Sequence, residues 1–587
     1  MFTELRTHSA FSFGDGAVTP ERLVRRAAEL GYPALGLTDT ADLGGVVRFV
    51  VAARQQGIKP IVGAELLVGA HPAAFLAMNE RGYRNLAGLV TCARVGNLDT
   101  WHREHPHTLR GRATVTWHQV AERSEGLIAL TGPASGELAS LVRAGRRADA
   151  FRRLAEWREV FGEGLAVEVQ RHEAGTNEAE LADLLVDLAE TLRVPWIVTQ
   201  DPRYIDRKSR LVHDMLTALR ADLTLSEAAS QGVLLPNGRW RLLSPEEMTL
   251  RWAARPEGVE ATAALADRCS FDLAWMRPPL PHFAVPEGHT DDTYLRLCVE
   301  QGARDRWGLL TDTQRRQLEH ELGVIRRLGF AGFFLVMWDA VRQARELGIL
   351  CQGRGSAANS AVAYCLGVTA VDPVLHGLLF ERFLSEVRVD GQTEAPDIDL
   401  DIEHDRREEL LDYAYGRWQR SCAAIACTVQ HYRAPNALLD AMRVLGYPAE
   451  LAFTLSKRIH RSDAAEGAEY VRDTLAKEFG LPLDDPRGRA VLAIMEGCDE
   501  LPRLRSTHVG GFVLSSAPLG DWLPIEHTTM GRTIVQFDKD DLDSIGVPKF
   551  DFLGLGGLSL VRRAFDVIER RTGERPEMYR LPQDDPA

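Results

Sequence analysis

Three aspartates alternate with aliphatic residues in the segment EAPDIDLDIEHD, at positions 394–405. Asp397, Asp399 and Asp401 occupy every second position, and isoleucine or leucine stands between them. Carboxylate oxygens are the protein ligands that magnesium prefers. Carboxylates gathered on one surface can hold two divalent cations roughly 3.5 to 4 Å apart. The pattern therefore suits a centre that binds a pair of divalent cations.

The alternation predicts a half-buried β-strand that positions these side chains. Residues at i, i+2 and i+4 share one face of a strand, while the aliphatic residues face a core. Carboxylates two residues apart then lie roughly 6 to 7 Å from each other, and without a cation they repel one another. A solvated acidic edge strand without any metal is the alternative that this pattern alone leaves open.

A glycine-rich segment, CQGRGSAANSAVAYCLG at 351–367, precedes the acidic strand. Gly353 and Gly355 flank Arg354, and Ser356 and a predicted helix follow. Glycines let a backbone approach phosphate closely, a helix N-terminus attracts anions, and arginine adds a charged fork. Taken alone, the segment is more typical of a structural turn in which small residues pack against a helix.

A second acidic strand is predicted in VPKFDFLGLGG, at 547–557. Lys549 and Asp551 fall on one face of this apolar strand, and Phe550 and Phe552 fall on the other. A lone aspartate there costs several kcal/mol unless it is paired or bound to a metal. Lys549 is its simplest partner. The nearby segment STHVGGFVL, at 506–514, indicates no chemistry by itself.

Length and composition describe a multidomain protein of ordinary globular type. A chain of 587 residues exceeds what one hydrophobic core supports. The formal net charge of −14 argues against a nucleic-acid partner in general, although it does not exclude a local basic groove. Eight cysteines without a CxxC pair argue against a disulfide scaffold or a zinc ribbon. With no signal peptide and no span long enough for a bilayer, we expect a cytoplasmic protein without membrane contact.

Alternating β-rich and helical runs in the first 275 or so residues predict a barrel-like α/β unit. The proline-rich stretch at 277–288 indicates a domain boundary. Helices are expected over 291–347 and again over 405–480, and β segments over 510–516 and 532–538. The second half is thus predicted to be mixed α+β.

Taken in order, several segments resemble the bacterial C-family DNA polymerases, the alpha subunits of DNA polymerase III. They are GRGSAANSAVAYCLGVTAVDP, FERFLSEVR, PDIDLDIEHDRREE, STHVGGFVL, RTIVQFDKDDLD and KFDFLGLG. The phrases DIEHDRREE, PIEHTTMGRT and VQFDKDDLD are most similar to the error-prone branch, whereas KFDFLGLG is closer to the replicative branch. The opening ELRTHSAFSFGDGA, with LTDTADLGG and NERGYRNLAGLV, resembles the polymerase and histidinol phosphatase (PHP) domain. The resemblance covers essentially the whole chain.

The resemblance implies a multidomain protein of α/β and α+β class. A PHP-type distorted α/β barrel is expected first, followed by a nucleotidyltransferase-type palm with a helical thumb insertion. The implied domains are the PHP domain at 1–276, the first part of the palm at 277–432, the thumb-like insertion at 433–508, the second part of the palm at 509–560 and the start of the fingers at 561–587.

The function implied is that of a template-directed DNA polymerase of the error-prone type. Such an enzyme adds deoxynucleotides to a primer 3′ end by two-metal phosphoryl transfer, in damage-tolerant synthesis. Its partners would be primer–template DNA and deoxynucleoside triphosphates. The resemblance implies that Asp399, Asp401 and Asp551 hold two Mg²⁺ ions and are catalytic, with Asp397 in reserve. Triphosphate binding is expected from Gly353, Arg354, Gly355, Ser356 and Lys549.

The PHP half departs from the histidine-rich pattern of active members. Arg6 stands where the first histidine of an HxH pair is expected, and Arg203 follows Asp201 and Pro202. The other substituted places hold Thr40 and Pro72, whereas Asp15, His8, Glu65 and Asp201 remain. Arginine repels a cation and offers it no lone pair. We therefore predict a degenerate PHP metal site and a supporting role for this domain.

Family members continue past the final RLPQDDPA into fingers, a clamp-binding region and further modules. We therefore expect no clamp binding from this chain, although accessory polymerase proteins are possible partners. Two other functions stay open: a non-catalytic DNA-binding remnant, and a PHP-type metal-dependent phosphoesterase.

Overall fold

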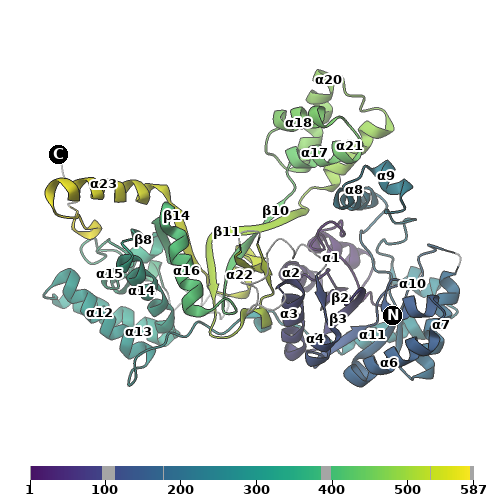
Figure 1. Cartoon of the computed structure of the whole chain (residues 1–587), viewed down its shortest axis with the longest axis horizontal. Coiled ribbons are helices and arrows are strands. Elements are labelled where there is room, and N and C mark those ends of the chain that lie inside the picture. The colour runs from purple at the N-terminus through teal and green to yellow at the C-terminus, as the bar shows by residue number, and fades with distance from the viewer. Residues whose placement is uncertain (1, 96–112, 176, 385–397, 529–530, 582–587) are drawn as a thin grey trace. The chain divides into compact units, whose positions relative to one another are not determined.

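The computed structural model describes residues 2–95, 113–175, 177–384, 398–528 and 531–581, so Asp397 lies outside the described residues. Two compact units make up the chain (Figure 1). The first combines Met1–Met276 with Thr428–Ser506, and the second combines Arg277–Cys427 with Thr507–Ala587. In the described ranges, no helix has both the length and the apolar character needed to cross a membrane.

The first unit is built on a seven-stranded sheet in which β1 to β3 and β5 to β7 follow one another and β4 pairs with β2. Its strands are β1 (Ala34–Leu37), β2 (Lys59–Val68), β3 (His71–Ala77), β4 (Thr114–Val115), β5 (Leu127–Leu130), β6 (Leu165–Val169) and β7 (Trp196–Val198). The N-terminal segment links the two ends of this sheet. Gly36 of β1 donates a backbone hydrogen bond to Glu4, and His8 donates one to Pro202, just after β7. The sheet is therefore curled, as the predicted barrel-like α/β unit requires.

Helices surround this sheet and extend the unit. They are α1 (Pro20–Glu29), α2 (Val46–Gln55), α3 (Glu80–Val95), α4 (Trp117–Glu122), α5 (Glu137–Arg143), α6 (Arg147–Phe161), α7 (Glu178–Thr191), α8 (Ser209–Ala221), α9 (Leu225–Ser230), α10 (Pro245–Arg251) and α11 (Glu257–Asp267). A separate helical group consists of α17 (Ala434–Val444), α18 (Ala449–Arg458), α19 (Ala464–Tyr470), α20 (Ala476–Phe479) and α21 (Pro486–Gly497). This group packs on α8 (Figure 1), where Leu438, Met495 and Met215 belong to one buried hydrophobic cluster.

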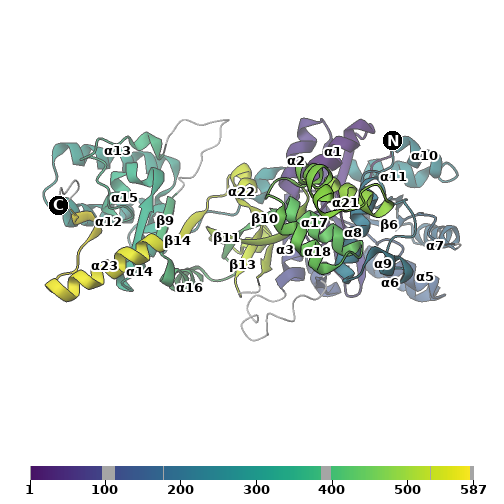
Figure 2. The same ribbon diagram turned by 90° about the horizontal axis from the view of Figure 1, so that it is seen from above.

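A second seven-stranded sheet, in the order β12-β13-β10-β11-β14-β9-β8, carries the predicted acidic strands. Its members are β8 (Cys351–Arg354), β9 (Ile398–Glu403), β10 (Ala423–His431), β11 (Pro502–Leu514), β12 (Ile525–His527), β13 (Thr533–Asp538) and β14 (Phe550–Leu555). The helices of the second unit are α12 (Asp291–Trp307), α13 (Asp312–Leu328), α14 (Ala331–Glu346), α15 (Ala361–Cys365), α16 (Arg407–Trp418), α22 (Lys539–Ile545) and α23 (Gly556–Thr572). Figure 2 shows β9 and β14 side by side.

The apolar faces of β9 and β14 are buried as their sequence patterns predict. Leu400, Ile402, Phe550 and Phe552 are fully buried. Phe550 stacks on Phe333 of α14 with 4.3 Å between the ring centroids. This packing holds one face of the two strands in the core and directs the alternate side chains to the other face.

Two expectations about secondary structure are wrong. The segment 405–480 was expected to be helical, yet residues Ala423–His431 form β10, and five of the nine are alanine, isoleucine or valine. The helix expected directly after Ser356 begins only at Ala361, because a 3₁₀ turn at Gly355–Asn359 comes first. The domain boundaries drawn from the resemblance stay predictions.

Candidate active site

Strand register brings two distant acidic segments together. β14 pairs in parallel with β9, so that Asp551 lies opposite Asp399 and Leu553 lies opposite Asp401. Neighbouring strands are about 4.8 Å apart. All three aspartates therefore share one face of the sheet, although about 150 residues separate the segments in sequence.

Arg354 lies between the two aspartates of β9. It stands on β8, which pairs antiparallel with β9 and places Arg354 opposite Asp399. Its Nε atom is 3.4 Å from Asp399 Oδ2 and 3.4 Å from Asp401 Oδ1. The Arg354 side chain is half exposed, so this ion pair stands at the edge of solvent.

Asp401 is the buried member of this pair. Burial raises its pKa above the ordinary value, the charge of Asp399 raises the pKa further, and Arg354 opposes both effects. Its Oδ1 atom is buried and accepts no hydrogen bond from the described residues. A buried carboxylate oxygen that lacks a hydrogen-bond donor is costly, and a bound cation would satisfy it.

Asp551 has a lysine beside one of its carboxylate oxygens and a histidine beside the other. Lys549 Nζ is 3.7 Å from Asp551 Oδ2, and His508 Nδ1 is 3.7 Å from Asp551 Oδ1. His508 Nδ1 accepts backbone hydrogen bonds from Gly510, at 3.2 Å, and from Gly511, at 2.6 Å. Because Nδ1 is the acceptor, a neutral His508 carries its proton on Nε2.

The electrostatics around His508 favour this neutral form. Burial lowers the pKa of His508, and the nearby positive charge of Lys549 lowers it further. The STHVGGFVL segment, which indicated no chemistry in the sequence, thus lies at the site. Paired glycines after a histidine were the only signal that could have drawn attention to it.

Gly511 leaves the space that Asp551 and His508 occupy. It lies opposite Asp551 in the antiparallel pairing of β11 with β14. A Cβ atom at this position would stand 2.9 Å from His508 Nδ1 and 3.3 Å from Asp551 Oδ1. Any larger residue would therefore push one of these side chains away.

The glycines of the GRGS segment have distinct structural roles. Gly353 donates a 2.6 Å backbone hydrogen bond to Val368, and a Cβ on Gly353 would come within 2.8 Å of that same oxygen. Gly355 has a φ of +65°, in the left-handed region that favours glycine. Gly353 therefore allows β8 to pack closely against Val368, and Gly355 begins the tight turn that follows β8.

The helix N-terminus after this turn already has an anionic partner. The backbone N–H groups of Ala361 and Val362 donate to the carboxylate of Glu321, at 2.9 and 3.0 Å. Ser360 Oγ donates to the same carboxylate at 2.7 Å. The expected use of this helix terminus for phosphate is therefore wrong, since Glu321 occupies it.

Glu403 continues the acidic row and was not singled out from the sequence. It follows Asp401 by two residues on β9, and its side chain is fully buried. Arg562 of α23 pairs with it, with 2.5 Å between Nε and Oε2. Burial raises the pKa of Glu403, and Arg562 and Arg406 oppose this shift. Glu403 therefore links α23 to the sheet, and Arg562 balances its negative charge.

The donor set of the three aspartates fits hard divalent cations. In the ranges that the structure describes, no three His, Cys, Asp or Glu side chains are gathered tightly enough to hold an ion as they stand. Oδ1 of Asp401, which accepts no hydrogen bond from the described residues, and the shared face of the three carboxylates nevertheless match oxygen coordination of magnesium. Arg354 and Lys549 neutralise these carboxylates within the chain.

A second cluster of charged side chains lies inside the curled sheet of the first unit. The guanidinium of the fully buried Arg6 pairs with Glu65, with Glu168 at 2.6 Å and, through Nε, with Asp201 at 3.3 Å. His8 Nε2 is 3.2 Å from Asp201 Oδ1. Arg6 thus pairs with Glu65 and Asp201, two of the carboxylates that the sequence marked as remaining ligands, and with Glu168, which was not marked.

Arg203 fills the other side of this cluster. It pairs with Asp15, and with Asp201 at 2.9 Å. The charge of Arg203 is the main influence that holds the pKa values of Asp15 and Asp201 well below the ordinary value, against the opposite effect of burial. The fully buried Arg6 and the partly buried Arg203 thereby supply the positive charge that balances this acidic group.

Two family models match the chain. Residues 293–554 match the bacterial DNA polymerase III alpha NTPase domain, and residues 4–172 match the PHP domain. The resemblance drawn from the sequence motifs, including the N-terminal PHP domain, is confirmed. The 293–554 match includes Asp399, Asp401 and Asp551.

Curated relatives match over the whole chain. An error-prone DNA polymerase of Pseudomonas syringae pv. syringae (strain B728a) is 38% identical over 590 residues, which cover 100% of this chain and 54% of that protein. An error-prone DNA polymerase of Mycolicibacterium paratuberculosis (strain ATCC BAA-968 / K-10) is 39% identical over 604 residues, which cover 100% of this chain and 52% of that protein. The chain spans about half the length of the curated relatives it matches.

Solved structures add little. An amidohydrolase from Chromobacterium violaceum aligns over 34% of this chain and 87% of its own, at 17% identity and a TM-score of 0.23. A TM-score this low has no bearing on the site.

Proposed function

We propose that this chain, which carries a PHP domain and the NTPase domain of a bacterial DNA polymerase III alpha subunit, is the catalytic part of an error-prone, template-directed DNA polymerase. It would extend a primer 3′ end with deoxynucleotides during damage-tolerant synthesis. The observation that supports this proposal best is the register of β14 and β9, with Asp551 opposite Asp399. A solvated acidic edge strand would not need a third carboxylate from elsewhere in the chain.

In this proposal Asp399, Asp401 and Asp551 hold two magnesium ions. The ions would supply charge stabilisation to phosphoryl transfer, a reaction in which catalysis is mostly positioning and electrostatics. Arg354 is a half-exposed, bidentate donor directly beside these carboxylates, and it is suited to binding the triphosphate. Lys549 adds a positive charge next to Asp551. Gly353 precedes Arg354 within β8, and Gly355 and Ser356 belong to the turn that follows it.

We further propose that the PHP domain binds little or no metal and supports the fold. Arg6 and Arg203 pair with the acidic residues that would otherwise act as ligands. A guanidinium is always charged and offers no lone pair to a metal. This arrangement also disfavours a PHP-type phosphoesterase. Metal analysis of the purified chain tests the proposal that this domain binds little or no metal. Two or three bound transition-metal ions that persist in an Asp399→Ala, Asp401→Ala variant would contradict that proposal.

Primer–template DNA and deoxynucleoside triphosphates are the proposed substrates, as in the polymerases that the chain resembles. The net charge of the chain is −14, so the chain as a whole repels the phosphates of DNA. DNA would therefore bind at local basic surfaces. Accessory polymerase proteins and a cytoplasmic location stay predictions.

Primer extension tests this function. The chain is incubated with a primed template, deoxynucleotides and magnesium, beside an Asp399→Ala, Asp401→Ala variant. Extension that the variant lacks supports the proposal. DNA binding without extension by either protein favours a non-catalytic DNA-binding remnant. Phosphate release from model esters that is insensitive to both substitutions favours a phosphoesterase.

A further inference from the structure

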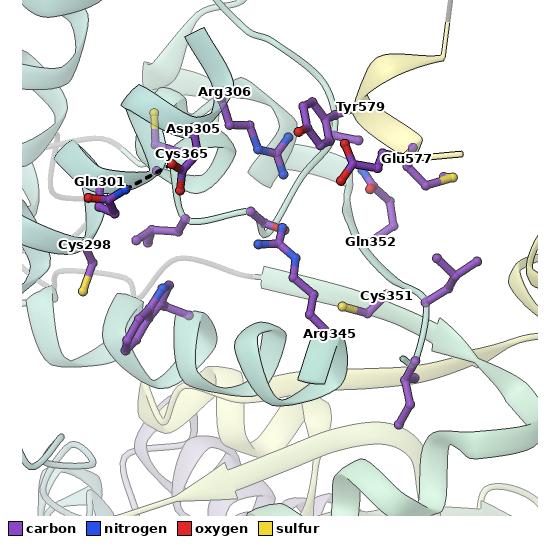
Figure 3. A pocket seen from close by; sticks show the side chains of 18 of the residues that line it. Cys298, Gln301, Asp305, Arg306, Arg345, Cys351, Gln352, Cys365, Glu577 and Tyr579 are labelled. Carbon is purple, nitrogen blue, oxygen red and sulfur yellow. Dashed lines mark hydrogen bonds between the residues drawn. The ribbon is translucent and has the colours of Figure 1, made fainter. Parts of the chain in front are cut away.

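A cavity of about 840 Å³ lies in the second unit, separate from the three aspartates (Figure 3). Its walls come from α12, α14, β8, the turn after α15 and the segment 575–579. None of Asp399, Asp401 and Asp551 lines it. Cavities of roughly 300 to 1,000 Å³ are the size that small-molecule ligands occupy.

Two arginines reach into this cavity from different helices. Figure 3 shows Arg306 of α12 and Arg345 of α14 extending toward the same space, with Tyr579 beside Arg306. Arg306 donates a hydrogen bond to the carbonyl oxygen of Thr369, and Arg345 donates one to that of Gly367, at 3.2 and 2.9 Å. Two carbonyls of one turn thus hold both guanidiniums in place.

The residues around the two guanidiniums leave space for Arg345 and hold Arg306 in place. Gly367 has a φ of +79°, and a Cβ there would overlap the guanidinium of Arg345. Arg306 lies between two rings, 4.5 Å from the centroid of Tyr364 and 4.4 Å from that of Tyr579. Cation–π contacts of this kind fix the plane of a guanidinium. Apart from the N–H that is bonded to Thr369, the donors along its edge can bind a ligand.

Neither arginine forms an ion pair with a carboxylate in the part of the chain that the structure describes. Two carboxylates of the wall have other partners: Asp305 accepts a 3.1 Å hydrogen bond from Gln301, which also lines the cavity, and Glu577 pairs at 2.8 Å with Arg580, which does not. Burial lowers the pKa of Arg306, and the like charge of Arg345 lowers it further. An anion between the two guanidiniums would relieve this repulsion.

We propose that this cavity binds a nucleoside monophosphate, with its phosphate between Arg306 and Arg345 and its base against the aromatic wall. A phosphate monoester carries a charge of about −1.5 to −2 at pH 7, which two guanidiniums balance. The volume exceeds the need of inorganic phosphate alone. Trp338, Tyr294 and Tyr579 line the cavity and offer aromatic surface to a planar ring. This site is independent of the proposed polymerase activity.

Isothermal titration calorimetry on the 587-residue chain tests the proposal. Adenosine monophosphate is compared with adenosine, which lacks the phosphate, and with ribose 5-phosphate, which lacks the base. EDTA is present throughout, so that metal-dependent binding at the aspartates is suppressed. We expect adenosine monophosphate to bind at least about tenfold more tightly than either fragment.

Variants locate the binding. Arg306→Gln and Arg345→Gln should each weaken it at least about tenfold, since each removes a charge-assisted contact. Arg304→Gln is the matched control, because Arg304 lies on the same helix but pairs outside the cavity with Glu300. If an arginine variant fails to fold, Gln301→Glu adds a negative charge at the exposed rim and should also weaken binding.

Three results would overturn the proposal. The first is an absence of heat on titration with adenosine monophosphate at millimolar concentration. The second is equal affinity for ribose 5-phosphate, which would remove the role of the base. The third is binding that survives both arginine substitutions but is lost in the Asp399→Ala, Asp401→Ala variant. Retained binding in that last variant supports the proposal and is unaffected by the outcome of primer extension.

Discussion

Asp551 lies opposite Asp399 in the parallel pairing of β14 with β9. The two residues stand on neighbouring strands, and their side chains share one face of the sheet. The apolar side chains on the opposite face of these two strands are fully buried. A carboxylate placed this way repels its neighbour unless a cation lies between or beside them. In the chain alone, Arg354 and Lys549 provide that positive charge.

Gly511→Ala should damage the site with little effect on the fold. The new methyl group would meet His508 Nδ1 and Asp551 Oδ1 at 2.9 and 3.3 Å, and would displace one of them. We expect primer extension to fall about 10- to 100-fold, the usual effect of disturbing groups next to a metal ligand. Gly416→Ala is the control, since nothing lies within 4 Å of its Cβ position. Equal extension rates for the two variants would argue against the role of Gly511.

Arg354→Ala should act mainly on nucleotide binding. Loss of the guanidinium beside Asp399 and Asp401 removes the donor proposed for the triphosphate. Steady-state kinetics should show KM for the deoxynucleotide raised about tenfold or more, with a smaller change in kcat. Arg354→Lys should restore part of the affinity, because it keeps the charge but not the bidentate geometry. A fall in kcat alone, with KM unchanged, would contradict this role.

Arg6→Gln should strongly destabilise the first unit. Arg6 is fully buried, and its removal leaves Glu168 and Asp201 buried without their shared cation. Breaking a buried pair in this way costs about 3 to 5 kcal/mol. Arg26→Gln breaks only the exposed pair with Glu29 and should cost less than about 1 kcal/mol. Thermal unfolding of both variants provides the comparison, and similar melting temperatures would show that the buried network does not support the fold.

The effect of Arg203→Gln should depend on pH. Arg203 holds the pKa values of Asp15 and Asp201 below the ordinary 3.8. Carboxyls with a depressed pKa stabilise the folded state above the unfolded value, and this stabilisation is lost as the pH falls through the folded one. The melting temperature of the variant should therefore lie furthest below wild type at pH 5 to 8. The gap should narrow as the pH falls below about 3.8. A gap that stays constant from pH 8 to pH 3 would exclude this linkage.

The acidic strand could be predicted from the sequence because its pattern is local. Asp399 and Asp401 alternate with aliphatic residues in the sequence. In the structure this segment is strand β9, and its aliphatic residues are buried. The pairing of Asp551 with Asp399 could not be derived in the same way, because strand partners and register depend on the whole sheet. Only the family resemblance joined the two segments. Glu403, the next residue on the same face, was not singled out, although Ile402 separates it from Asp401 and the alternation therefore includes it.

Other differences arise where local preference and tertiary context disagree. β10 contains three alanines, which favour helices in isolation, yet its buried position in the sheet decides its conformation. The helix after Ser356 starts later than its composition indicates, because the 3₁₀ turn at Gly355–Asn359 comes first and Glu321 accepts a hydrogen bond from the first helical residue, Ala361. The roles of Arg6 and Arg203 were predicted only as losses of metal ligands. Their ion pairs depend on side chains brought together by the curled sheet.

Manganese binding tests the central claim most directly. Manganese replaces magnesium at oxygen ligands, and its free ion can be counted by electron paramagnetic resonance in the presence of a dideoxy-terminated primer–template and the next deoxynucleotide. We predict that Asp399→Asn, Asp401→Asn and Asp551→Asn each weaken manganese binding at least about tenfold. Asp540→Asn, a change at an exposed residue paired with Lys539, should leave it unchanged. If Asp551→Asn binds manganese as well as wild type while the other two lose it, the three aspartates do not form one metal centre.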